Sequence, residues 1–337
     1  MAVMGDKLLI QLCNLSTYED DLRTFDRDGK ILHNFLHEHD LAGLELLIDQ
    51  PWEERIVPRH LIKGVHLRYW SNWLDFWLGD RQQLVLQFGN EANIVKHYGG
   101  ADRAILVENY RAEIQKAIAT GAEYAVLHVS NARFGELFTY DFGYSDEQVI
   151  NGTIELVNAV MDGIKSNITI LFENLWWPGL TLCDAKLAAR LLEKVNHPYK
   201  GFMLDTGHLM NTNTALRTQQ EGINYILATL KKLGELKEAI QGIHLHSSLS
   251  GKYVLRTIKT ADGSFDKNRI MAHILQIDQH RPFEHPDVHR IVDYIQPRYL
   301  VHEFTFRCRA ELSQYISTQQ AALQGNILAR GEVSWNC

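Results

Sequence analysis

The chain has 337 residues, of which 45% are hydrophobic and 22% are charged, and its formal net charge is −7 at pH 7. This composition is typical of a globular protein, and no apolar run reaches the roughly 18 residues that a membrane span needs. The four scattered cysteines form neither a paired metal motif nor a disulfide framework, and the acidic balance gives no broad attraction to nucleic acid, although it does not exclude a local basic patch.

Residues 1–10 lack a basic segment followed by a long apolar stretch, so no signal peptide is predicted. Together with the scattered cysteines, this pattern favours a cytoplasmic protein. No Pro-, Gly- or Ser-rich linker, low-complexity tract or short-period repeat divides the sequence. We therefore expect a single domain.

Eight apolar segments of strand length alternate with helical patterns along the chain. The predicted strands span residues 7–15, 43–48, 64–70, 123–129, 167–173, 202–204, 241–247 and 299–304. The predicted helices span residues 26–39, 102–120, 145–165, 184–195, 219–233, 286–295 and 310–328, with a short helical turn at 58–62. Ser145 is the expected N-cap of its helix, because Asp146 and Glu147 occupy the first turn. Two connections, 71–100 and 248–276, are too long for plain loops, and the second should contain one short helix.

This alternation predicts an α/β fold, a (β/α)8 or TIM barrel formed by residues 1–337 as one domain. Its core should span about residues 7–330, with a long insertion at 248–276. The strands are continuous apolar runs rather than polar–apolar alternations, as expected for parallel strands buried on both faces. A doubly wound sheet is the alternative architecture.

Metal-ligand residue types occur at the carboxyl ends of the predicted strands. In a barrel these ends converge on one mouth, where the chemistry of the fold takes place. A single histidine at a strand end is usually a hydrogen-bonded structural residue, and we expect this of His246 and His302. The residues at or just beyond the strand ends are His66, His128, Glu173, Asp205, His208, His244 and Glu303, and Asp278 and His280 lie in the connection before the last strand.

The two glutamates distinguish this pattern from a set of structural histidines. A carboxylate that ends a fully apolar strand is costly to bury unless it is paired or bound to a cation. Carboxylate and neutral imidazole ligands suit a divalent metal such as Zn²⁺ or Mn²⁺, with Mg²⁺ or Co²⁺ as alternatives. We therefore predict one divalent ion held by Glu173, Asp205, His244 and Glu303.

Four segments of the sequence, FENLWWPG, MLDTGH, GIHLH and LVHEF, resemble the xylose isomerase-like TIM-barrel superfamily, also called the AP endonuclease family 2 fold. Its sugar isomerases and epimerases hold one metal with four residues, which match Glu173, Asp205, His244 and Glu303. Its endonuclease IV branch builds a three-metal site with further ligands. By this resemblance the further ligands would be His66, His128, His208, Asp278 and His280, with Tyr69 in the place of a DNA-stacking tyrosine.

The resemblance leaves two enzymatic hypotheses open. In a sugar, polyol or keto-acid isomerase or epimerase, Glu173 and Glu303 would move protons through a metal-stabilised ene-diolate while His208 holds a substrate oxygen. In an endonuclease IV-like phosphoesterase, the extra ligands would hold two or three metals for attack on AP-site DNA or another phosphoester. Because the glycine-rich segments of endonuclease IV are missing, the sequence favours the isomerase and a carbohydrate-like substrate over nucleic acid.

A third hypothesis is a barrel that binds metal and ligand without catalysis. The tryptophans and phenylalanines near the mouth would wall a sugar pocket, pack in the core or form the interface of a homo-oligomer. The connection 248–276 leaves the seventh strand at the mouth and is long enough to cover it. We expect this segment to act as a lid that closes through Gly251 and Gly263.

Overall fold

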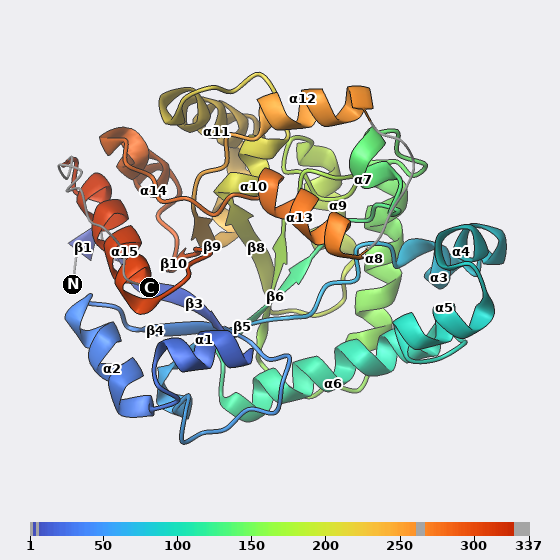
Figure 1. The fold of residues 1–337 in the computed structure, drawn as a ribbon, viewed down its shortest axis with the longest axis horizontal. Coiled ribbons are helices and arrows are strands. Elements are labelled where there is room, and N and C mark those ends of the chain that lie inside the picture. Colours follow the sequence, from blue (N-terminus) through green and yellow to red (C-terminus); the bar gives the residue numbers. More distant parts are fainter. Residues whose placement is uncertain (1–2, 5–6, 261–266, 327–337) are drawn as a thin grey trace.

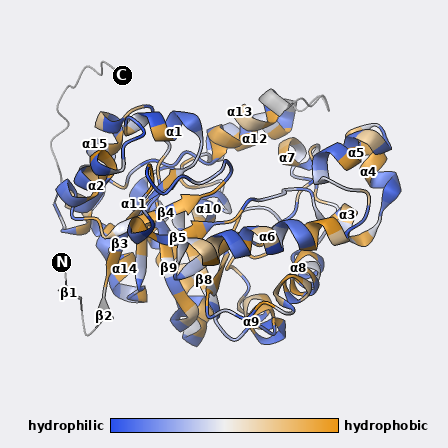
Figure 2. Cartoon of the chain, turned by 90° about the horizontal axis from the view of Figure 1, so that it is seen from below, coloured by the Kyte–Doolittle hydropathy of each residue, from blue (hydrophilic) through white to orange (hydrophobic). Residues whose placement is uncertain are grey.

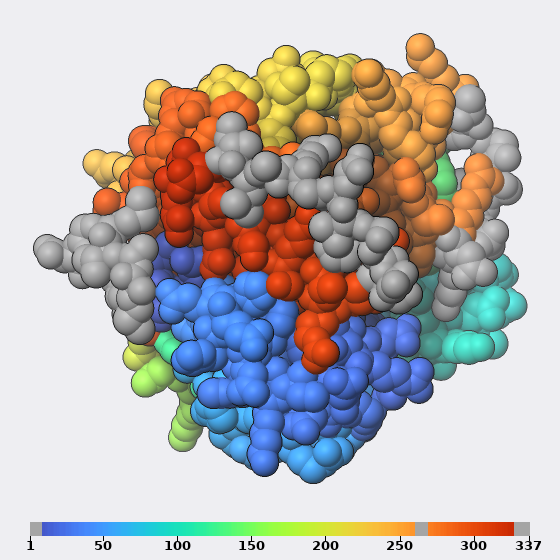
Figure 3. Space-filling model, turned by 60° about the vertical axis from the view of Figure 1, so that its left-hand side comes forward, coloured from blue at the N-terminus to red at the C-terminus, as the bar shows by residue number. Residues whose placement is uncertain are grey.

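The computed structural model describes residues 3–4, 7–260 and 267–326. Eight parallel strands close into a barrel in the order β10-β3-β4-β5-β6-β7-β8-β9, and helices surround it (Figure 1). The predicted (β/α)8 barrel is confirmed, and the doubly wound alternative is wrong. β10 pairs with β3, so the last and first barrel strands lie side by side. On the surface, the start of the chain in blue likewise lies against its end in red (Figure 3).

All eight predicted strands are present. They are β3 (Ile10–Ser16), β4 (Gly43–Leu47), β5 (Ile62–His66), β6 (Tyr124–His128), β7 (Thr169–Glu173), β8 (Lys200–Asp205), β9 (Ile240–Leu245) and β10 (Tyr299–His302). The predicted first strand is divided, because Lys7–Leu8 forms β2 in an antiparallel pair with β1 (Val3–Met4) outside the barrel. The third strand ends at His66 rather than at residue 70, since the backbone N–H of Arg68 turns to the Glu113 carboxylate instead of a neighbouring strand.

The outer ring contains helices close to those predicted. They are α2 (Gly29–Glu38), α6 (Ala104–Thr120), α8 (Asp146–Met161), α9 (Ala185–Lys194), α11 (Gln219–Leu233), α14 (His289–Ile295) and α15 (Arg309–Leu323). Shorter pieces are α1 (Glu19–Thr24) and the 3₁₀ turns η1 (Arg59–Leu61), η2 (Gly234–Ala239) and η3 (Pro286–Val288). Ser145 caps α8 through a capping box with Gln148. The last predicted helix ends at Leu323, and residues 327 and 328 lie outside the described residues.

The two long connections contain more helix than the sequence indicated. Between β5 and α6 lie α3 (Leu74–Leu78), α4 (Arg81–Phe88) and α5 (Glu91–Tyr98), which project to one side of the barrel (Figures 1 and 2). The connection after β9 contains two helices, α12 (Gly251–Thr260) and α13 (Lys267–Ile277), rather than one. Its expected hinge Gly263 lies outside the described residues. None of the described helices is long and apolar enough to span a bilayer.

Apolar side chains fill the barrel and the layer between barrel and helices, and hydrophobic residues, coloured orange in Figure 2, recur along the strands and helices. Inside the barrel, Leu12, Tyr124, Val126, Leu171 and Met203 pack together, while a larger cluster joins the strands to the helices. Burial on both faces explains why the strands are continuous apolar runs. Among the described cysteines, Cys13 and Cys183 are free.

A buried ion pair attaches α3 to the loop that follows β6. The fully buried carboxylate of Asp75 accepts hydrogen bonds from Arg133 Nε at 2.8 Å and from the second guanidinium nitrogen at 2.7 Å. Tyr144 donates its hydroxyl to the same carboxylate at 2.7 Å, and Gln87 donates its amide at 2.8 Å. Four donors thus compensate one buried charge, and together they hold the α3–α5 segment against the barrel.

We expect Asp75→Ala to lower the free energy of unfolding by about 3–5 kcal/mol, because it leaves the Arg133 guanidinium without its buried partner. Asp80→Ala is the matched control, since Asp80 only caps α4 through Gln83 N and should cost about 1 kcal/mol. Urea denaturation of both variants measures the difference. Equal losses would contradict a structural role for the buried pair.

Candidate metal centre

The structure brings all nine predicted site residues into one cluster at the carboxyl end of the barrel. Five strands, β5 to β9, end at or next to a member of the cluster, and Glu303 directly follows β10. The short helix α10 (Thr206–Asn211) supplies His208, and the segment after α13 supplies Asp278 and His280. The nine residues are His66, His128, Glu173, Asp205, His208, His244, Asp278, His280 and Glu303. Their roles as ligands stay predictions.

The four residues predicted to hold the metal form a compact group. One ligand atom from each of Glu173, Asp205, His244 and Glu303 lies within 4.8 Å of the others. Nδ1 of His244 is 3.0 Å from Glu173 Oε1 and 3.1 Å from Glu303 Oε2. Glu173, Asp205 and His244 are fully buried. We call this set the four-ligand group.

A second group uses the other oxygen of Glu173. Its Oε2 lies 3.1 Å from Nε2 of His66 and 3.1 Å from Nε2 of His128. These three residues also bring their ligand atoms within 4.8 Å of one another. Glu173 therefore faces the four-ligand group with one oxygen and the two histidines with the other, which is the geometry of a bridging carboxylate.

A third group lies on the other side, around Asp278. Its Oδ2 is 3.1 Å from Nε2 of His208 and 3.5 Å from Nε2 of His280. Asp205 Oδ2 is 3.5 Å from Nδ1 of His208, so this group also adjoins the four-ligand group. The backbone N–H of His208 donates to Asp205 Oδ1 at 2.6 Å, which fixes the start of α10 at the end of β8.

His246 is fully buried and hydrogen-bonded, as we expected of a structural residue, but it also lies among the site residues. Its Nε2 lies 2.8 Å from Asp205 Oδ2, and its ring belongs to ligand groups with Asp205 and His208 and with His280 and Glu303. The hydroxyl of Thr206 holds the backbone of residue 246. Gly207 leaves room for the ring, because a Cβ there would lie 2.1 Å from His246 Cε1. The sequence signal was the alternation HLH at the end of the seventh strand.

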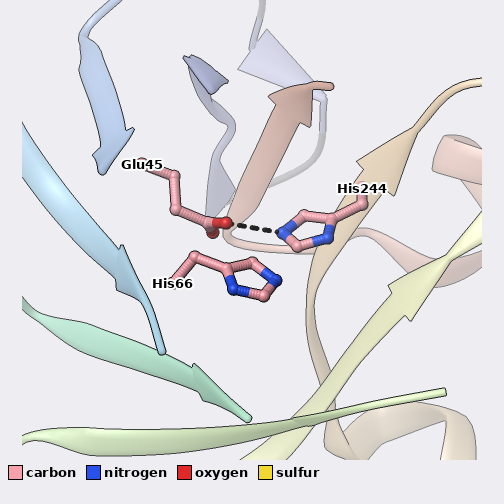
Figure 4. Close-up of side chains that lie close together, drawn as sticks. All are labelled: Glu45, His66 and His244. Atoms are coloured by element: carbon pink, nitrogen blue, oxygen red, sulfur yellow. Dashed lines mark ion pairs between the residues drawn. The ribbon is translucent and has the colours of Figure 1, made fainter. Parts of the chain in front are cut away.

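His302, by contrast, is the structural residue that the sequence indicated. Its Nε2 lies 2.9 Å from Gln11 Oε1, and its Nδ1 accepts from Gln319 at 2.9 Å. Burial lowers its pKa to about 3, so the imidazole is neutral. Glu45 is a second residue that sequence reasoning missed. It lies within β4, and its Oε1 is 2.9 Å from Nε2 of His244 (Figure 4).

The cluster has the properties of a metal site. Carboxylates and imidazoles are the donor set of divalent transition metals. Ligand-type atoms that are buried yet lack a hydrogen-bond partner among the described residues carry lone pairs that an ion would use. These atoms are the carboxylate oxygens Asp278 Oδ1 and Glu303 Oε2. The residues present therefore fit a divalent metal.

Electrostatics inside the cluster couple the histidines to the acids. Burial alone would lower the pKa of His66, but the hydrogen bond to Glu173 and the charge of that carboxylate raise it to about 9. The pKa of His280 also reaches about 9, because Asp278 and Glu303 outweigh its burial. Burial would raise the pKa of Glu173, yet the charges of His128 and His244 hold it well below its usual range.

Residues 90–309 match the family model described as xylose isomerase-like TIM barrel. The chain belongs to this family. The resemblance that the four sequence segments indicated is thereby confirmed. The matched region of this xylose isomerase-like barrel contains β6 to β10, so His66 and Glu45 lie outside it.

Several solved structures are similar to this xylose isomerase-like barrel. The crystal structure of AsfvAP:AG matches with a TM-score of 0.52 and 12% identity over 94% of this chain and 98% of that chain. A D-tagatose 3-epimerase-like protein matches with a TM-score of 0.47 and 14% identity, covering 92% and 98%. D-allulose 3-epimerase from Methylomonas sp. in complex with D-allulose matches with a TM-score of 0.45 and 13% identity, covering 95% of each chain. No curated protein sequence matches the chain.

Aromatic rings and the connection after β9 surround the cluster of this xylose isomerase-like barrel. The ring of Tyr69 lies 4.8 Å from that of His128, and the ring of Trp176 lies 5.1 Å from that of His208. Val254 of α12 and Ile277 of α13 pack with Trp176 and other residues of the loops that follow β6 and β7. The predicted covering segment thus lies at the end of the barrel that carries the cluster, and its opening and closing stay a prediction.

We expect the affinity of the xylose isomerase-like barrel for Zn²⁺ or Mn²⁺ to keep rising as the pH increases to about 9. The pKa values of His66 and His280 are raised to about 9 in the metal-free protein. Metal binding must therefore displace their protons, which changes the affinity about tenfold per pH unit for each proton displaced. Calorimetric titrations between pH 6 and 9, in buffers of different ionisation enthalpy, measure affinity and proton release together. An affinity that is constant above pH 7, with no proton released, would contradict this assignment.

Proposed function

We propose that the chain is a multinuclear, metal-dependent phosphoester hydrolase that acts on phosphodiesters of the nucleic-acid type. The observation that carries this proposal is the bridging position of Glu173, whose two oxygens face two different ligand groups at 3.0–3.1 Å. A mononuclear isomerase site needs only the four-ligand group. Apart from His208, which would hold a substrate oxygen, the additional histidines and Asp278 have no assigned task in that chemistry, whereas a hydrolase with two or three metals uses all of them.

The residues divide into three sets that would each hold a divalent ion. Bound ions of this kind supply Lewis-acid stabilisation of phosphoryl oxygens and a nucleophile at neutral pH. Zn²⁺ and Mn²⁺ are the metals that the mixed imidazole and carboxylate donors suit best. The sets are His66, His128 and Glu173; Glu173, Asp205, His244 and Glu303; and His208, Asp278 and His280, with His246 beside the last two sets.

The other residues of the mouth have roles that follow from their positions. Tyr69 lies beside His128 and Trp176 beside His208, and both rings pack in the same hydrophobic cluster at the mouth. Aromatic faces bind bases and sugar rings by stacking. The nearly complete burial of Glu173 and Asp205 keeps bulk water away from the charges that orient the substrate. In this arrangement, the aromatic residues position the substrate and the cluster performs the chemistry.

A sugar isomerase or epimerase is the second candidate, and one observation favours it. Glu173 and Glu303 approach the same nitrogen, His244 Nδ1, at 3.0 and 3.1 Å from strands β7 and β10. Two carboxylates around one point are the arrangement in which one removes a proton from a carbon acid and the other returns it. This candidate requires the four-ligand group and does not require His66 or His128.

We expect His128→Gln to abolish phosphodiester cleavage, with a loss of more than about 100-fold, because it removes a ligand outside the four-ligand group. The substrates are duplex DNA with an abasic site and bis(p-nitrophenyl) phosphate, tested with Zn²⁺- and Mn²⁺-loaded protein. His289→Gln, a change of the same type at a surface histidine far from the cluster, is the matched control and should leave activity unchanged.

A parallel assay follows solvent deuterium into ketoses, hydroxy-keto acids and inososes. Deuterium uptake that depends on Glu173 and Glu303, survives His128→Gln and occurs without any phosphodiester cleavage would replace the hydrolase by the isomerase.

A further inference from the structure

Glu45 is a buried carboxylate inside the barrel that the proposed mechanism does not use. It lies in the middle of β4 and is 2% exposed, although Leu44 and Leu46 beside it are apolar. Its Oε1 is 2.9 Å from Nε2 of His244, and the side chain points from β4 across the barrel towards β9 (Figure 4). The imidazole of His244 thus lies between Glu45, which faces Nε2, and the carboxylates of Glu173 and Glu303, which face Nδ1.

A tyrosine holds Glu45 in this position. The hydroxyl of Tyr124, at the start of β6, donates to Glu45 Oε2 at 2.8 Å. The Tyr124 ring fits because residue 64 has no side chain, since a Cβ there would lie 2.1 Å from Tyr124 Cζ. Its other neighbour is the Tyr299 ring, with centroids 4.5 Å apart. The carboxylate of Glu45 is therefore held by a tyrosine whose ring packs in the barrel interior.

Burying a carboxylate in this position lowers the stability of the fold unless a cation or a positively charged side chain pairs with it. Among the described residues, the group in ion-pair contact with Glu45 is His244. The contact is an ion pair rather than a hydrogen bond, because Nε2 of His244 has no hydrogen-bond partner among the described residues. Its chemical effect concerns the ring proton of His244. Nδ1 faces Glu173 and Glu303 and must be free of its proton to bind a metal, so the proton has to reside on Nε2, the nitrogen that faces Glu45.

We propose that Glu45 is a positioning residue that fixes the Nε2–H tautomer of His244. The Nδ1 lone pair of His244 then points to the place where the other three members of the four-ligand group would hold the ion. The inference rests on the metal dependence of the proposed function and is independent of the reaction catalysed. Carboxylates that accept the second N–H of a ligand histidine orient the ring and increase its basicity, and their loss typically weakens metal binding 10- to 100-fold. The charge of Glu45, and not only its shape, is what performs this task.

The test compares Glu45→Gln, which keeps the size of the side chain but removes its charge, with Tyr124→Phe, which removes only the support of the carboxylate. Glu123→Gln is the matched control, because Glu123 lies next to Tyr124 but pairs with Arg298 and Tyr299 outside the cluster. Zn²⁺ affinity is measured by chelator competition. We expect Glu45→Gln to weaken one ion by about 10- to 100-fold, Tyr124→Phe to weaken it less, and Glu123→Gln to have no effect.

The second readout is the imidazole ¹H–¹⁵N NMR spectrum of the zinc-loaded protein. It should show His244 protonated at Nε2 in the wild type and a mixture of tautomers or a broadened signal in Glu45→Gln. If Glu45→Gln does not fold, Glu45→Asp takes its place, because it keeps the charge but withdraws the carboxylate by one methylene group.

The outcomes separate the failure of this inference from the failure of the proposed function. Unchanged Zn²⁺ affinity and an unchanged tautomer in Glu45→Gln, in a protein whose wild type binds metal, would overturn the role of Glu45 alone. Complete loss of one ion, with the affinity of the four-ligand group unaltered, would make Glu45 a ligand with His66 and His244 and would also overturn it. A wild-type protein that binds no metal would refute the metal centre itself.

Discussion

The buried carboxylate of Glu173 is the interaction on which the site depends. It is fully buried at the end of β7, and the rings of His66, His128, His208 and His244 lie within 3.4 Å of its two oxygens. A charge so placed is unfavourable unless cations surround it. In the metal-free protein, protonated His66, His208 and His244 provide this compensation, because the neighbouring carboxylates raise their pKa values, whereas burial lowers the pKa of His128. A metal centre would replace those protons by ions.

The barrel makes this concentration of charge possible. Because parallel strands end at the same edge of the sheet, eight separate segments can each contribute one polar residue to one mouth while their remaining residues form an apolar core. The xylose isomerase-like family shares this arrangement, but a shared fold does not determine the chemistry. In the proposed function, what would separate a multinuclear site from a four-ligand one is the presence of His66, His128, Asp278 and His280 beside the four-ligand group.

Much of this could be predicted from the sequence, because uninterrupted apolar runs ending in Glu, Asp or His mark buried parallel strands at a barrel mouth. Glu45 could not be found in this way. It lies in mid-strand, where a polar residue is read as facing solvent, and only closure of the barrel brings β4 opposite β9. The place of His246 beside Asp205 could not be predicted for a different reason. Its position depends on the Thr206 hydroxyl and on the missing side chain of Gly207, two tertiary contacts that periodicity does not encode.

The number of metal ions bound tests the account most directly. Crystals of the zinc-loaded protein, measured on both sides of the zinc absorption edge, give the count and the position of each ion from the anomalous signal. A multinuclear centre built around Glu173 predicts two or three peaks, with the two ions that share Glu173 about 3.5–4 Å apart. A single peak between Glu173, Asp205, His244 and Glu303, with His66 and His128 not contacting any ion, would contradict it.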